Sequence, residues 1–257
     1  MPQVSELKEC LKALHLSFAA EAYSESAEEA RAENLTHEEF LLALMQRELE
    51  HRRENRTGRW LHESRLPLEK SLSSFDRSRL PSKVNATLNM LLEGEFLDRY
   101  ENVLAFGNPG SGKTHFVCAL AQELIHRGRR VLFCSCQLLV QDLLRAKREL
   151  TLAQELKKLD RYEALIIDDI GYVQQERQEM EVLFALLAER YEKRSVLITS
   201  NLPFSKWESI FKDPMTTAAA VDRLVHHSVI VEMNLESYRL HAAKRATAKT
   251  APRDKTG

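Results

Sequence analysis

Residues 107–114 have the composition and spacing of a loop that binds the phosphates of a nucleotide. The loop consists of Gly107, Asn108, Pro109, Gly110, Ser111, Gly112, Lys113 and Thr114. Glycines allow a backbone to curve closely around phosphate groups with its N–H groups pointing inward. In this pattern the lysine reaches the β- and γ-phosphates, and the hydroxyl of the last residue binds Mg²⁺. The pattern predicts a site for ATP and Mg²⁺; the alternative is a tight turn with a surface lysine.

The segments on either side of the loop are of the kind that such a site requires. The apolar run 102–106 precedes the loop and predicts a strand, and the run 115–125 follows it and predicts a helix. The N-terminus of that helix adds about half a positive charge beside the phosphates. We therefore expect the nucleotide contacts to come from the loop and from His115, which follows it.

Two carboxylates and an amide stand at the ends of other apolar runs. Asp168 and Asp169 end one run, and Asn201 follows another. If the first run is a strand beside the strand that precedes the loop, Asp168 would lie near the Mg²⁺. Asp169 would then point at the γ-phosphate, where a carboxylate orients or deprotonates water, and Asn201 would lie between the two strands. The alternatives are a strand end that turns into solvent and an ordinary turn asparagine.

Five short apolar runs alternate with longer amphipathic segments in the rest of the chain. The runs are NVLAF, RVLFCSC, ALIIDD, SVLITS and SVIVEM. They are rich in Val, Ile, Leu and Phe without polar alternation, which is typical of strands buried on both faces of a parallel sheet. We therefore predict an α/β domain at residues 76–240, with about five parallel strands and helical crossovers.

The first 75 residues have a different texture, with few β-branched residues and many Leu, Ala, Glu and Arg. Thr36 and Glu39 have the spacing of a capping box, and apolar residues follow them at helical intervals. This pattern predicts a small all-α domain at residues 1–75, joined to the next domain by a connector near residues 71–81. Residues 241–257 are basic and are predicted to form a disordered tail.

The totals leave the kind of partner open. Lys and Arg number 37 and Asp and Glu 38, so the net charge is 37 − 38 = −1. Local basic patches matter more than this total for binding nucleic acid. No apolar run is long enough to span a bilayer and the N-terminus has no signal-peptide layout, so we expect a cytoplasmic protein. The four cysteines, and the adjacent His226 and His227, lack further ligands at motif spacing and are interpreted as structural.

Several motifs together resemble the IstB/DnaC-like branch of the AAA+ ATPases, which includes helper ATPases of bacterial insertion sequences. The motifs are GNPGSGKTHF, LIIDDIGY, LITSNLPFSKW and AAAVDRLVHHS followed by ESYRL. The N-terminal stretches LKALHLSFAAEAYSESA and THEEFLLALMQRELEHRRENR fit as well, so the resemblance covers roughly residues 5–240. It implies an AAA+ P-loop core behind a helical N-terminal domain, with duplex DNA and a transposase as partners.

The resemblance also implies roles for individual residues. The catalytic set would comprise the Walker A lysine, the two Walker B carboxylates and the sensor 1 amide: Lys113, Asp168, Asp169 and Asn201. Thr114 and Asp168 would hold the metal ion. Arg223 would be an arginine finger that enters the nucleotide site of a neighbouring subunit, which implies a ring or spiral homo-oligomer. The alternative is that Arg223 pairs with Asp222 or caps a helix.

Two departures from common AAA+ enzymes qualify this resemblance. The second Walker B position is Asp169 instead of glutamate, and the shorter side chain predicts a looser contact with water and slow hydrolysis. Too little chain follows the last predicted strand for a full C-terminal lid domain, so a sensor 2 role for Arg239 is doubtful.

Clusters of basic residues offer candidate DNA contacts. The candidates are Arg145, Lys147 and Arg148, then Arg52, Arg53 and Arg56, and the aromatic Tyr172. Such clusters would give salt-sensitive, largely sequence-independent binding to phosphates, and the alternative for each is a solvated helix face. Two other functions compete with a transposition helper: a DnaC-like loader of a replicative helicase, and a small-molecule kinase with a P-loop. The kinase is disfavoured because no arginine-rich lid insertion is evident.

Overall fold

The structure is a computed structural model that describes residues 2–171, 177–203, 206–207, 221–222, 224–235 and 237. The chain divides into two compact units, Met1–Arg59 and Trp60–Gly257, which are described separately. This division lies inside a helix and precedes the predicted domain boundary at residue 75. Residues 60–75 therefore group with the unit that contains the sheet. The predicted tail, residues 241–257, lies outside the described residues.

The first unit is helical. Its elements are α1 (Pro2–Ala13), α2 (Ser17–Ala32) and most of α3 (His37–Glu63). The capping box at the start of α3 is confirmed: the Thr36 N–H donates to the Glu39 carboxylate at 2.8 Å, and the Glu39 N–H donates to Thr36 Oγ1 at 3.3 Å. Ala19, Ala22 and Leu44 form its small buried core.

A buried carboxylate fastens α3 to α2. Glu48 accepts hydrogen bonds from the Ala19 N–H at 2.8 Å and from Arg52 at 2.7 Å. Burial opposes ionisation of Glu48, but these donors outweigh it and lower the pKa of the carboxyl group. Because the folded-state pKa is lowered, ionised Glu48 stabilises this unit at neutral pH, and that contribution is lost as pH falls through this pKa. Arg52, a predicted DNA contact, also donates to the His15 carbonyl and so holds the unit together.

The second unit is built around a five-stranded, all-parallel sheet, as predicted. The strands are β1 (Asn102–Phe106), β2 (Val131–Ser135), β3 (Ala164–Ile170), β4 (Ser195–Ser200) and β5 (Ser228–Glu232). Their order is β2-β3-β4-β1-β5. The inner strands β1 and β4 are buried along their whole length, while the edge strands β2 and β5 are partly exposed. This burial explains why the inner strands lack polar alternation.

One expectation about the strand order is wrong. The strand that carries Asp168 does not lie beside the P-loop strand β1, because β4 pairs with both β1 and β3. Strands that are consecutive in sequence need not be neighbours once a crossover helix connects them, so chain order cannot settle this point. The expected place of Asn201, just after a strand that lies between the other two, does agree with the structure.

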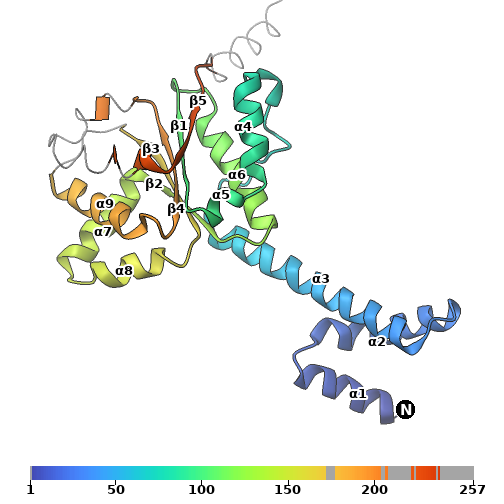
Figure 1. The fold of residues 1–257 in the computed structure, drawn as a ribbon. Helices are drawn as coiled ribbons and strands as arrows, with labels where there is room; N and C mark the ends of the chain where they lie inside the picture. Colours follow the sequence, from blue (N-terminus) through green and yellow to red (C-terminus); the bar gives the residue numbers. More distant parts are fainter. Residues whose placement is uncertain are drawn as a thin grey trace, which may run out of the picture. The chain divides into compact units, whose positions relative to one another are not determined.

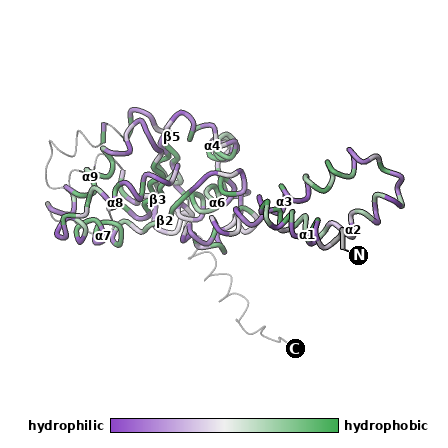
Figure 2. The backbone as a smooth tube through the Cα atoms, turned by 90° about the horizontal axis from the view of Figure 1, so that it is seen from below, coloured by the Kyte–Doolittle hydropathy of each residue, from purple (hydrophilic) through white to green (hydrophobic). Residues whose placement is uncertain are grey.

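Helices cover both faces of the sheet and make a three-layered unit (Figure 1). One face carries α4 (Ser82–Leu92), α5 (Glu95–Asp98) and α6 (Lys113–His126). The other carries α7 (Cys136–Arg148), α8 (Leu152–Leu159) and α9 (Arg177–Arg190). Each face has its own buried apolar cluster. In Figure 2, hydrophobic and hydrophilic residues alternate along the helices, as expected of helices that bury one face. In the described residues, no helix is long and apolar enough to cross a membrane.

The stretch between Trp60 and Leu80 packs on the α4–α6 side of the sheet. Leu66 and Leu80 are buried in that cluster, and Phe75 packs against it. The Gln122 side chain, on α6, donates to the carbonyls of Pro67, Leu68 and Lys70 at 3.5, 3.4 and 3.1 Å. Residues predicted to be a connector thus form part of the second unit, and the 3₁₀ turn Arg77–Arg79 lies within them.

A buried arginine joins the ends of several elements on the α9 side. Arg190 is 2% exposed, and its guanidinium donates to the carbonyls of Leu159, Tyr162, Glu163 and Ser195 at 2.9–3.4 Å. Burial lowers the pKa of Arg190 to about 10, so it stays charged at neutral pH. Its role is to supply an additional donor to four carbonyls, of which those of Leu159 and Glu163 also accept from backbone N–H groups.

We expect Arg190→Met to destabilise the second unit by about 3 kcal/mol, because four carbonyl groups lose their hydrogen bond to the guanidinium while the side-chain volume is nearly kept. Urea unfolding followed by fluorescence and circular dichroism measures this change. Arg194→Met is the matched control, since Arg194 lies nearby but is about one-third exposed and donates to the Asp160 carbonyl. Equal, small losses in the two variants would contradict the role assigned to Arg190.

Candidate nucleotide-binding site

The glycine-rich loop connects β1 to α6 in a conformation that other residues could not adopt easily. Gly110 and Gly112 have φ angles of +80° and +98°, in the left-handed region. A side chain at Gly107 is excluded for another reason, because its Cβ would lie 2.2 Å from the carbonyl oxygen of Met233. The loop therefore keeps close contact with the strand end on one side and leaves its inner face to a ligand.

Lys113 is the first residue of α6 and is 6% exposed. Its ammonium group donates to the carbonyls of Gly107 and Asn108 at 2.8 and 3.0 Å. These carbonyls belong to the loop itself, so the ammonium lies within the phosphate cradle. A phosphate oxygen bound there would be a stronger, charge-assisted acceptor than either carbonyl.

Three oxygen-bearing side chains meet beside Lys113. Thr114 Oγ1 donates to the Asp168 carboxylate oxygens at 2.9 and 3.2 Å, and Thr199 Oγ1 donates to Asp168 Oδ1 at 2.6 Å. They come from α6, β3 and β4, so the strand order brings them together. Burial, and secondarily the neighbouring Asp169, raises the pKa of Asp168 although both hydroxyls favour the ionised form. The ionised form of Asp168 therefore lowers the stability of the apoprotein.

The residues present fit a Mg²⁺ ion. Adjacent ligands of an octahedral Mg²⁺ at 2.0–2.1 Å lie about 2.9 Å apart, which matches the separation of Thr114 Oγ1 and Asp168 Oδ1. Both are hard oxygen donors, and one carries a negative charge. Nearby, the buried Ser111 hydroxyl has no hydrogen-bond partner among the described residues, which leaves it available to a ligand in the cradle.

Asp169 is set apart from Asp168 by an irregularity in β3. The register between β3 and β4 shifts between Ile167 and Ile170, and Asp169 has a φ of +60°. Its N–H donates to Thr199 Oγ1 at 2.9 Å. This strained conformation leaves the carboxylate exposed at the cavity, where Asn201 also lies. Both residues therefore line the cavity that opens over the loop.

A cavity of about 360 Å³ opens over the loop. The loop residues from Pro109 onward, His115, Asp169, Asn201 and Leu235 form one part of its wall. The rest of the wall comes from the stretch predicted to be a connector and from the residue just before it: Lys70, Ser74, Phe75, Asp76, Arg79 and Leu80. The sequence feature that could have indicated this wall is the aromatic Phe75, which stands in a largely polar stretch. An aromatic and apolar wall beside a phosphate loop suits a nucleotide base.

His115 fastens this wall to α6. Its Nε2 lies 3.2 Å from Ser74 Oγ and 3.0 Å from the Ser71 carbonyl oxygen, and its ring lies 4.9 Å from that of Phe75. The predicted nucleotide-binding residue His115 is therefore on the cavity wall and positions the residues around it.

The predicted DNA contacts belong to both units, and some predicted residues fall outside the described chain. Arg145 pairs with Asp142 on α7, and Lys147 pairs with Glu181 on α9 at 2.8 Å. Arg148 is exposed at the end of α7, and Arg53 and Arg56 are exposed on α3.

Three predicted residues lie outside the described residues: the arginine finger Arg223, the DNA candidate Tyr172 and the sensor 2 candidate Arg239.

Fold and site together define a class of protein. A parallel sheet of order β2-β3-β4-β1-β5, a P-loop after β1 and acidic residues at the end of β3 define a P-loop ATPase of the AAA+ type. The family of IstB-like ATP binding proteins matches residues 9–246. The chain belongs to this family and is an ATPase.

Curated relatives connect the family to insertion sequences. An insertion-sequence ATP-binding protein of Sinorhizobium fredii is 43% identical over 237 residues, which is 92% of this chain and 80% of that protein. The ATP-binding protein of insertion sequence IS21 from Pseudomonas aeruginosa is 36% identical over 98% of this chain and 95% of its own length. The chain is thus an IstB-like ATPase of the insertion-sequence type.

Solved structures agree on the fold. The DnaC helicase loader matches with a TM-score of 0.57 at 17% identity, over 65% of this chain and 98% of the loader. DnaA of Aquifex aeolicus bound to AMPPCP matches with a TM-score of 0.57 at 18% identity, over 75% of this chain and 58% of DnaA. At such identities the likeness concerns the fold alone.

Proposed function

We propose that this ATPase assembles with Mg²⁺ and ATP on duplex DNA and assists or regulates the transposase of an insertion sequence. The observation that carries the proposal is the combination of a formed phosphate cradle with 43% identity to an insertion-sequence ATP-binding protein over 92% of the chain. The names of the relatives connect the chain to insertion sequences, and the phosphate site supports a function that depends on ATP.

The residues of the site divide the work of hydrolysis. Lys113 and the loop N–H groups hold the β- and γ-phosphates, and Thr114 with Asp168 holds the Mg²⁺, which offsets charge on the phosphates when bound. Asp169 and Asn201 orient the attacking water at the γ-phosphate. Arg223 of a neighbouring subunit completes the site, so that hydrolysis depends on assembly.

Assembly is tested by analytical ultracentrifugation of the full chain with Mg²⁺ and a non-hydrolysable ATP analogue. We expect oligomers on duplex DNA and smaller species without nucleotide. Arg223→Ala should keep nucleotide affinity, lower hydrolysis by about 10³-fold and weaken assembly, whereas the exposed Arg127→Ala should behave as wild type. A monomer under all conditions would refute the proposal, and assembly on single-stranded DNA alone would favour the helicase-loader alternative.

The basic end of α7 is our proposed DNA contact. Arg145→Glu with Arg148→Glu should weaken duplex binding and reduce the slope of log K against log salt by up to about 2, because each lost phosphate contact lowers the slope by about 0.9. Lys147 is left in place since its pair with Glu181 joins α7 to α9, whereas Arg145 pairs with Asp142 within α7. The control carries the same charge change at exposed lysines, Lys158→Glu with Lys193→Glu. A filter-binding salt series in which the two double variants behave alike would exclude this contact.

A further inference from the structure

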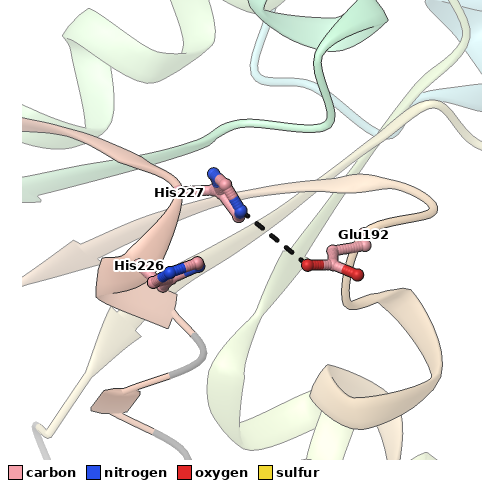
Figure 3. Close-up of side chains that lie close together, drawn as sticks. All are labelled: Glu192, His226 and His227. Atoms are coloured by element: carbon pink, nitrogen blue, oxygen red, sulfur yellow. Dashed lines mark ion pairs between the residues drawn. The ribbon is translucent and has the colours of Figure 1, made fainter.

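Two adjacent histidines and a glutamate that is distant from them in sequence come together beside the start of β5 (Figure 3). Figure 3 shows Glu192 and His227 directed toward one another from separate loops, with His226 beside them. One ligand atom from each of the three side chains lies within 4.8 Å of the other two, and His227 Nε2 lies 3.8 Å from Glu192 Oε1. Among the described residues, this is the group in which three such ligands converge.

The backbone on which the two histidines stand is held firmly. The Asn102 N–H, at the start of β1, donates to the His227 carbonyl at 2.7 Å, and its side-chain amide donates to the Leu224 carbonyl at 3.3 Å. The same side chain accepts from the Val196 N–H, at 3.0 Å, in β4. Asn102 thus ties the histidine segment to the strand that follows Glu192.

Glu192 stands on an equally well-fixed turn. The turn leaves α9 at the buried Arg190, whose carbonyl accepts from the N–H groups of Lys193 and Arg194 at 3.0 and 2.9 Å. Glu192 itself has a φ of +54°, which few residues other than glycine adopt. The charged neighbours do not oppose a cation strongly, because Lys193 pairs with Glu189 and Arg194 lies 3.7 Å from the Asp160 carboxylate.

We propose that Glu192, His226 and His227 bind one divalent transition-metal ion, for which Zn²⁺ is the representative. Imidazole and carboxylate groups are suitable ligands for Zn²⁺, whereas Mg²⁺ prefers oxygen alone. Ligands about 2.0–2.1 Å from a tetrahedral Zn²⁺ lie about 3.3 Å apart, so the pair at 3.8 Å needs only a small side-chain rotation. All three side chains are exposed and can therefore make this rotation, and a water molecule can fill the fourth coordination position.

The bound ion would link the α9–β4 turn to the segment that leads into β5. Arg223 precedes His226 by three residues in the sequence, so the ion would restrain the part of the chain that carries the proposed arginine finger. This consequence rests on the proposed function, while the metal site does not. Cys118 and Cys134 compete weakly, because burial raises the pKa of Cys118 to about 12 and that of Cys134 to about 11.

Isothermal titration of the chelator-treated full chain with Zn²⁺, without nucleotide, tests the site. We expect one Zn²⁺ per chain in the wild type. Loss of an outer-shell partner alone costs about 10–100-fold in metal affinity, so Glu192→Gln, His226→Asn and His227→Asn should each cost at least as much. His126→Asn, at an exposed histidine that ends α6, is the matched control and should bind as wild type.

Two results would overturn the site. One is a wild-type chain that binds no Zn²⁺, and the other is undiminished Zn²⁺ binding in all three variants, which would place the ion elsewhere. Circular dichroism identifies any variant that fails to fold, and the remaining variants then decide the outcome. Because the titration measures metal binding without ATP, its failure would leave the proposed ATPase function unaffected.

Discussion

Lys113→Ala should remove high-affinity ATP binding from this protein. The ammonium group lies in the phosphate cradle, where it donates to the Gly107 and Asn108 carbonyls. With ATP bound, it would donate to phosphate oxygens, and charge-assisted hydrogen bonds contribute about 1.5–3 kcal/mol each. The loss of one or two such bonds corresponds to roughly a 100-fold weaker affinity.

Calorimetric titration with a non-hydrolysable ATP analogue measures the effect. Lys83→Ala is the matched control, because Lys83 is exposed on α4 of the same unit and is not among the residues that line the cavity. Alanine is a good helix former, so neither variant should disturb its helix. If Lys113→Ala bound the analogue as tightly as the control, the loop from Gly107 to Thr114 would not be the phosphate site.

Asp168→Asn should separate catalysis from stability. Asparagine keeps an acceptor oxygen for the hydroxyls of Thr114 and Thr199 but loses the negative charge that would hold Mg²⁺. We expect ATP hydrolysis to fall at least about 100-fold, because stabilisation of the transferring phosphate by the metal is worth several kcal/mol. Nucleotide binding without metal should change little.

The same substitution should raise the melting temperature of the apoprotein. Burial raises the folded-state pKa of Asp168 above its unfolded value, so the ionised form is less favourable in the folded protein. Stability is therefore lost as pH rises through that pKa, and asparagine removes this loss at neutral pH. Scanning fluorimetry without nucleotide, at neutral pH and near pH 4, should show a gain that shrinks on acidification.

The exposed Asp98→Asn serves as the control for both measurements, because Asp98 pairs with Arg129 at the surface. Such a pair contributes about 0–1 kcal/mol, so little change is expected. Wild-type hydrolysis in Asp168→Asn would transfer the metal-holding role to another group, such as Asp169. A lower melting temperature would mean that the hydrogen bonds of the carboxylate outweigh its burial cost.

The local elements of this protein were readable from its sequence. The five apolar runs became the five strands, and the glycine-rich loop lies between a strand and a helix, as its flanks predicted. These features depend on apolar periodicity and on backbone conformations that glycine allows, which neighbouring residues determine among themselves. The capping box of Thr36 and Glu39 is another local feature, and it was likewise predictable.

Strand order and the cavity wall were harder to predict. The sequence does not show that β4 lies between β1 and β3, since crossover connections allow several orders. The stretch around Phe75 reads as a connector because it is polar and turn-rich, yet it lines the cavity through contacts with His115. Contacts of this kind depend on packing between segments that are distant in the sequence, and a local sequence pattern does not predict such packing.

The sequence by itself determined that this chain has a phosphate loop, a parallel sheet and carboxylates at a strand end, because each of these is a property of a short run of residues. Only the tertiary structure decided that Asp168 is shared by Thr114 and Thr199, and that Glu192 meets His226 and His227. These groups lie far apart in the sequence. Their meeting depends on which strands pair and how each turn is anchored, and the packing of the whole sheet determines both.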